Sequence, residues 1–213
     1  MKNIKIAALC LFGAVSSASA SSVVTGAALF EGGIFGDWTI SFTSTDPSIK
    51  LNSVNINLAP AGLFLDTTFA PPGATLPGAF APTSGAVSTG FTSITPGTAS
   101  AQNGATAYTL NFSSFDSGES FGYTVDVDQC SGLINIPCSI VTGAEFAGAT
   151  ITFNISSPYT SFSQTATFAD LLSTPNDFDA AASFRAEVPE PATLAMLGMA
   201  LTGMSLLRRK GQA

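Results

Sequence analysis

The middle of the chain is dominated by short segments in which apolar and polar residues strictly alternate. The apolar positions of five such segments are Trp38, Ile40 and Phe42; Val54, Ile56 and Leu58; Tyr108, Leu110 and Phe112; Phe121, Tyr123, Val125 and Val127; and Ile151, Phe153 and Ile155. Because successive side chains of a strand point to opposite faces, each segment buries one face only. Antiparallel sheets packed face to face satisfy such strands, whereas parallel sheets need helical crossovers, which we do not find. The pattern predicts an all-β fold, an antiparallel β-sandwich of jelly-roll type.

The alternating segments fall in residues 21–172, a length that suits one domain with its own hydrophobic core. Two stretches rich in Pro, Gly, Ser, Thr and Ala lack this pattern. We expect residues 71–101 to form a long excursion with at most one short strand, and residues 173–187 to form a linker.

Both ends of the chain have the composition of targeting segments. Residues 1–20 contain two lysines, an apolar stretch and the small residues Ala18, Ser19 and Ala20. This order predicts a secretory signal peptide that is cleaved after Ala20 by signal peptidase, following passage through the secretion translocon. The apolar stretch is too short to be retained as a membrane span.

The other end, residues 188–213, has three consecutive parts. Val188, Pro189, Glu190 and Pro191 precede an apolar run over residues 192–207, and the basic residues Arg208, Arg209 and Lys210 follow that run. Sixteen helical residues span roughly 24 Å against a hydrocarbon core of about 30 Å, so we expect a short transmembrane helix. The positive-inside bias places the basic cluster in the cytoplasm and residues 21–187 outside.

This three-part ending resembles the PEP-CTERM sorting signal of Gram-negative bacteria that make exopolysaccharide. The resemblance implies that a membrane-embedded exosortase recognises the proline-flanked Glu190 and removes the tail. It also implies an inner-membrane-anchored intermediate that is then transferred to the cell surface or to the extracellular matrix of a biofilm. Residues 115–128 are similar to a pattern found in the β-rich ectodomains of other PEP-CTERM proteins.

Two cysteines remain once the signal peptide is removed, and they close a short loop. In an exported protein, Cys130 and Cys138 are most simply explained as a disulfide bond. A redox or metal site would need the C-x-x-C spacing and further ligands, which this chain lacks.

Charge and composition exclude several classes of function. Residues 21–187 contain two basic and thirteen acidic residues, a net charge of −11, so nucleic acid is not an expected partner. The chain has no histidine, which excludes Ser-His-Asp and Cys-His catalysis and His-ligated metals. Two enzymatic alternatives remain formally open: a Ser-Lys dyad that uses Lys50, and a glycosidase that uses a pair of acids. We expect no catalytic residue.

Two aspartates at alternate positions are the candidate metal ligands. A strand over this region would place Asp126 and Asp128 on one face, with α-carbons roughly 7 Å apart. They could share a calcium ion, to which Asp116, Glu119 or carbonyls after Gln129 would add oxygens. The simpler alternative is a solvated polar strand face without a metal, and we expect no other cofactor.

These features predict a non-enzymatic structural protein of the cell surface or extracellular matrix that is associated with exopolysaccharide and sorted by exosortase. The alternative is a carbohydrate-binding module for the cell's own exopolysaccharide, with or without the help of calcium, in which Trp38 and exposed tyrosines form the aromatic platform for sugars.

Overall fold

The computed structural model describes residues 21–32, 36–69, 77–129, 139–141, 143–171 and 179–189. The chain divides into two compact units, of which Ser22–Val188 forms one, here called the β-domain. The other unit combines Met1–Ser21 with Pro189–Ala213 and lies, except for Ser21 and Pro189, outside the described residues. The predicted signal peptide and the apolar run 192–207 therefore lie outside them too.

Antiparallel strands make up most of the β-domain, which confirms the all-β prediction. The strands are β1 (Ser21–Glu31), β2 (Asp37–Ser44), β3 (Lys50–Asn57), β4 (Phe64–Leu65), β5 (Ala81–Ser84), β6 (Phe91–Thr95), β7 (Ala107–Phe115), β8 (Ser120–Thr124), β9 (Val127–Gln129), β10 (Ser139–Ile140), β11 (Thr150–Ser156), β12 (Ser161–Thr167), β13 (Ala169–Asp170) and β14 (Ala180–Pro189). The helical turns are η1 (Ala59–Ala61), α1 (Ala99–Gln102) and α2 (Gly143–Phe146). None of the described helices is long and apolar enough to cross a membrane.

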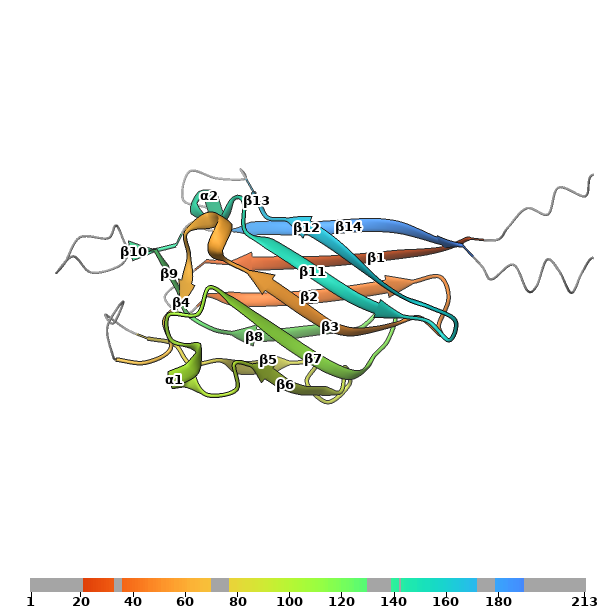
Figure 1. The fold of residues 1–213 in the computed structure, drawn as a ribbon, viewed down its shortest axis with the longest axis horizontal. Coiled ribbons are helices and arrows are strands. Elements are labelled where there is room, and N and C mark those ends of the chain that lie inside the picture. Colours follow the sequence, from red (N-terminus) through yellow and green to blue (C-terminus); the bar gives the residue numbers. More distant parts are fainter. Residues whose placement is uncertain are drawn as a thin grey trace, which may run out of the picture. The chain divides into compact units, whose positions relative to one another are not determined.

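The described strands form two large sheets and one small one (Figure 1). The order in the six-stranded sheet is β13-β14-β1-β2-β8-β5, and in the five-stranded sheet it is β12-β11-β3-β7-β6. The chain passes from one large sheet to the other between β2 and β3 and between β7 and β8, while β2 pairs with β8 and β3 with β7. The finer jelly-roll type stays a prediction from the sequence. The small sheet has the order β10-β9-β4.

Aromatic side chains from the two large sheets meet in one core, as in a β-sandwich. Trp38 of β2 lies edge-on to Tyr108 of β7 with ring centroids 6.2 Å apart, and Phe121 of β8 lies 5.3 Å from Phe112 of β7. The apolar positions of the alternating segments are buried, as predicted. At about 25 cal/mol per Å² of apolar surface, this burial is the main stabilising contribution.

Two sequence predictions about irregular segments are wrong. Residues 180–187, expected to be part of a linker, belong to strand β14 between β13 and β1. Its inward residues Ala180 and Ala182 are buried, but their small side chains give a weak alternation signal. Residues 81–84 and 91–95, expected to hold at most one strand, form both β5 and β6, because Phe80, Phe91 and Ile94 pack against the core. The rest of the predicted linker, residues 173–178, lies outside the described residues.

The two ends of the β-domain lie side by side. Strands β1 and β14 are neighbours in the six-stranded sheet, and Figure 1 shows that the start of β1 and the end of β14 are at the same end of the domain. The first two residues of the predicted sorting signal, Val188 and Pro189, therefore form the end of β14.

Candidate functional site

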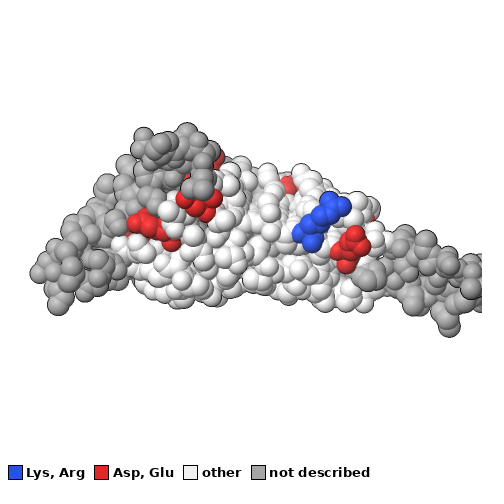
Figure 2. Space-filling view, turned by 90° about the horizontal axis from the view of Figure 1, so that it is seen from above, with Lys and Arg blue, Asp and Glu red and all other residues white. Residues whose placement is uncertain are grey.

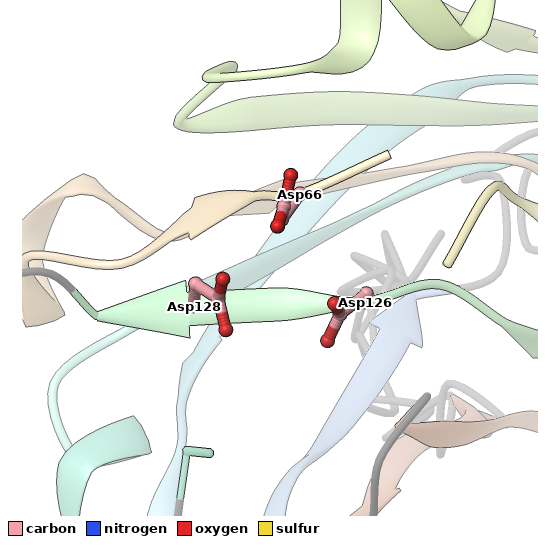
Figure 3. A group of neighbouring side chains, drawn as sticks. All are labelled: Asp66, Asp126 and Asp128. Atoms are coloured by element: carbon pink, nitrogen blue, oxygen red, sulfur yellow. The ribbon is translucent and has the colours of Figure 1, made fainter. Parts of the chain in front are cut away.

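Three aspartates meet at the junction of β4 and β9 (Figure 3). The antiparallel register pairs Phe64 with Asp128 and Leu65 with Val127, and the Asp66 amide continues it by donating to the Asp126 carbonyl at 3.1 Å. Asp66 is therefore opposite Asp126, while Asp128 lies two residues further along the same face. Figure 3 shows Asp66 on one strand, with Asp126 and Asp128 on the neighbouring segment facing it.

The three carboxyl groups are close together and shielded from solvent. Each offers an oxygen, and these oxygens all lie within 4.8 Å of one another. The exposed fraction is 0% for Asp66, 8% for Asp126 and 7% for Asp128. Both side-chain oxygens of Asp66 are buried without a hydrogen-bond partner. Leaving a buried acceptor unpaired costs about 1–3 kcal/mol, and more when it is charged.

The electrostatics of the cluster favour an added positive charge. Burial, followed by the negative charges of Asp128 and Asp66, raises the pKa of Asp126 to about 7. Burial and the neighbouring Asp66 also raise the pKa of Asp128 to about 7, and burial raises the pKa of Asp66. Within the described part of the chain, no basic side chain lowers these pKa values. Either protons or a cation must offset the mutual repulsion.

The sequence prediction for this site is partly confirmed. Asp126 and Asp128 do lie together, but the alternative of a solvated strand face is wrong because both are buried. The suggested further ligands are not in the group: Asp116 forms an ion pair with Lys50, and Glu119 accepts a hydrogen bond from the Asp116 amide. The third member, Asp66, was missed.

The prediction that Trp38 belongs to an aromatic platform for sugars is wrong. Trp38 is 1% exposed and stacks on Tyr123 in the core, with ring centroids 5.6 Å apart. Tyr108 and Tyr123 are buried as well, whereas Tyr159 is 71% exposed. The alternating pattern already predicts that Trp38 lies on the inward face of its strand. A tryptophan buried in this way cannot stack on a sugar, although the residue type suits that role.

The outer face of the five-stranded sheet carries a second candidate site, here called the hydroxyl-amide face. Two rows of side chains cross all five strands in register. The first row contains Thr165, Thr152, Asn55, Thr109 and Thr95, and the second contains Ser163, Asn154, Ser53, Asn111 and Ser93. Hydrogen bonds join neighbours within the rows, for example Thr152 to Thr165 at 2.8 Å and Asn55 to Thr109 at 3.0 Å. All ten side chains are uncharged.

The predicted sorting and disulfide residues fall mostly beyond what the structure describes. Val188 and Pro189 belong to β14, and Val188 packs against the core. The other sorting residues, Glu190, Pro191, Arg208, Arg209 and Lys210, lie outside the described residues, and so do Cys130 and Cys138.

In this chain the last strand of a β-rich domain is followed directly by a proline-flanked glutamate, an apolar run and a basic cluster, the order expected of a C-terminal sorting signal. A family model for the PEP-CTERM protein-sorting motif matches residues 187–210, which include Val188–Pro191 and the basic cluster. Neither curated proteins nor solved structures gave a match. The chain therefore carries a PEP-CTERM protein-sorting motif, which implies export through a membrane-anchored intermediate and processing by exosortase.

Proposed function

We propose that this protein is a non-enzymatic structural component of the cell surface or extracellular matrix, and that its hydroxyl-amide face contacts neutral exopolysaccharide. The observation that carries the proposal is the regular, uncharged array of hydroxyl and amide groups on this face. Both groups donate and accept hydrogen bonds, as do the hydroxyl groups of a sugar chain.

The spacing of the array suits a repeating polymer. Neighbours within a row lie about 4.8 Å apart, the distance between strands, and the two rows are about 7 Å apart, two residues along a strand. A polysaccharide that lies along a row meets a polar side chain at each strand. Many weak contacts can therefore add up without a deep pocket. We therefore expect a large contact area in which each side chain contributes little to the affinity.

Charge favours a neutral polymer over an acidic one. The basic Lys50 lies at one end of β3 and is paired with Asp116, so it adds little net charge to the face. None of the ten side chains of the face is charged, and Figure 2, which views the domain at right angles to Figure 1, shows that most of the described surface on that adjoining side is neither acidic nor basic. Because residues 21–187 carry a net charge of −11, an acidic polysaccharide would be repelled.

The position of the sorting signal agrees with a role at the surface. Only Glu190 and Pro191 separate the last residue of β14 from the apolar run that starts at Ala192. Exosortase would therefore cut next to a folded sheet and transfer the β-domain without a flexible stalk. A domain held this closely suits a structural role better than one that must reach distant substrates.

We also propose the Cys130–Cys138 disulfide. Support comes from the β9-β10 hairpin, in which Gln129 pairs with Ser139 and Asp128 with Ile140. The two cysteines are the sequence neighbours of Gln129 and Ser139, which this hairpin pairs. Opposed positions in an antiparallel pair have α-carbons about 4.5–5.5 Å apart, within the range that a disulfide bridges.

A sedimentation assay with insoluble polysaccharides tests the proposed contact. The full-length chain in detergent should be retained by neutral glucans and not by acidic alginate, with no polysaccharide cleaved. A double variant, Thr109→Val with Thr152→Val, keeps the strand shape but removes the two hydroxyls that flank Asn55 in the first row, and should lower retention several-fold.

The matched control is Thr39→Val, which removes an exposed hydroxyl from the six-stranded sheet. Equal loss of retention in the control, or no retention of the unsubstituted chain by any neutral polysaccharide, would contradict the proposed contact. Release of soluble sugar that is abolished by one Asp or Glu substitution would make the protein a hydrolase instead.

A further inference from the structure

We propose that Asp66, Asp126 and Asp128 bind one calcium ion, which joins β4 to β9 in the small sheet. The inference rests on geometry and burial in the β-domain and does not depend on polysaccharide binding. Its ligands come from two chain segments that are far apart in sequence and are held in register by the sheet.

The separation of the oxygens matches the size of the ion. Calcium binds oxygens at about 2.3–2.6 Å, so two oxygens on opposite sides of one ion are about 4.6–5.2 Å apart. One oxygen from each aspartate lies within 4.8 Å of the others, so a single calcium ion can contact all three. Magnesium binds at about 2.0–2.1 Å in a strict octahedron and usually keeps several waters, so a buried site with three protein carboxylates suits calcium better.

Asp66 gives the evidence for a ligand that is independent of the clustering. Its side chain is completely buried beside the other two carboxyl groups, and neither oxygen makes a hydrogen bond of normal geometry, although Asp128 and the Thr68 amide lie close enough to oppose the rise of its pKa. A buried carboxylate is normally paired or bound to a metal, because desolvation without compensation is very costly. An ion between the three groups would satisfy Asp66 and remove the repulsion across the strand pair.

The backbone around the site is already fixed, which reduces the ordering cost of binding. The Gly78 amide donates to the Asp66 carbonyl at 3.1 Å, and the Asp126 amide donates to the Gly78 carbonyl at 3.0 Å. Three segments therefore hold the carboxyl groups in place. Calcium should act as a structural clamp on this end of the domain, and its loss should loosen β4 and β9 before the two large sheets.

Calcium titration of the metal-free, full-length chain in detergent tests the site. At pH 7.5, isothermal titration calorimetry should give one calcium ion per chain, with magnesium binding at least tenfold more weakly. At a calcium concentration about 100-fold above Kd, Tm should rise by about 5–10 °C. Asp66→Asn and Asp128→Asn should each lose most of this rise.

In the absence of calcium, Asp66→Asn and Asp128→Asn should change the stability in the opposite direction. Without calcium, each should be more stable than the unsubstituted chain, because one of three repelling charges is gone. Asp37→Asn, on the exposed end of β2, is the matched control and should keep the full calcium response. The near-ultraviolet circular dichroism of the single tryptophan, Trp38, checks that each variant is folded.

Two results would overturn the calcium site. One is a folded chain whose Tm does not change with calcium, which would assign the cluster to shared protons. The other is a calcium response that Asp66→Asn and Asp128→Asn retain in full, which would place the bound ion elsewhere.

Discussion

A buried hydrogen bond between the two large sheets gives the sharpest test of the fold. Tyr108 of β7 and Tyr123 of β8 bring their hydroxyl oxygens to 2.8 Å, and the two residues are 1% and 0% exposed. Burial raises the pKa of both tyrosines, so both hydroxyls stay protonated and one donates to the other. Replacing either tyrosine with phenylalanine keeps the ring and removes only one partner.

The expected cost follows from the hydroxyl that is left behind. A buried polar group without a partner destabilises the folded state by about 1–3 kcal/mol, so each single variant should lose that amount. For a domain of this size the loss lowers Tm by about 2–10 °C. In the double variant no hydroxyl is left unpaired, so its loss should be at least about 1 kcal/mol smaller than the sum of the two single losses.

Urea unfolding of the four chains, followed by the fluorescence of Trp38, measures this coupling. The reporter is well placed, because Trp38 stacks on Tyr123 with ring planes 9° apart. Losses that simply add, within about 0.5 kcal/mol, would show that the two hydroxyls are not partners. The packing of the two sheets described here would then be wrong at its centre.

Three further predictions concern pH, the disulfide and sorting. In the metal-free chain, Asp126 and Asp128 bind protons more tightly when folded than when unfolded, since each pKa is raised from 3.8 to about 7 while Asp66 faces both. Stability should therefore fall as pH rises from about 4 to 7 and level off above it; a urea midpoint that rises over this range would refute the shift. Cys130→Ser should lower stability by about 2–3 kcal/mol and leave export intact, and a thiol assay that finds both cysteines free in the native protein would exclude the bridge. Glu190→Ala should leave the full-length chain in the membrane fraction, whereas Glu187→Ala, a substitution within β14, should not; normal processing of the first variant would count against recognition of this glutamate.

The strands that the sequence predicts correctly are those with large apolar residues on one face. Ile151, Phe153 and Ile155 are all buried, and their polar neighbours lie on the outer face. Strand β14 escaped detection because Ala180 and Ala182 fill space between packed strands without a strong hydrophobic signal. β5 contains Pro82, which suits an edge strand but reads as a turn or loop in a sequence.

The aspartate cluster could be predicted only in part, because its third member is remote in sequence. Alternation brings Asp126 and Asp128 to one face, and this local rule needs no knowledge of the fold. Asp66 joins them through the pairing of β4 with β9, and a register between distant strands cannot be read from either strand alone. An acid directly after the buried Leu63 and Leu65 was the available signal, although by itself it indicates only the end of a strand.

The intact mass of the protein recovered from the cell surface or medium tests the central claim most directly. Export followed by exosortase processing predicts a single species that begins at Ser21 and ends within Val188–Pro191, two hydrogen atoms lighter than its reduced form because of the disulfide. A species with the mass of the entire chain, Met1–Ala213, would contradict the account.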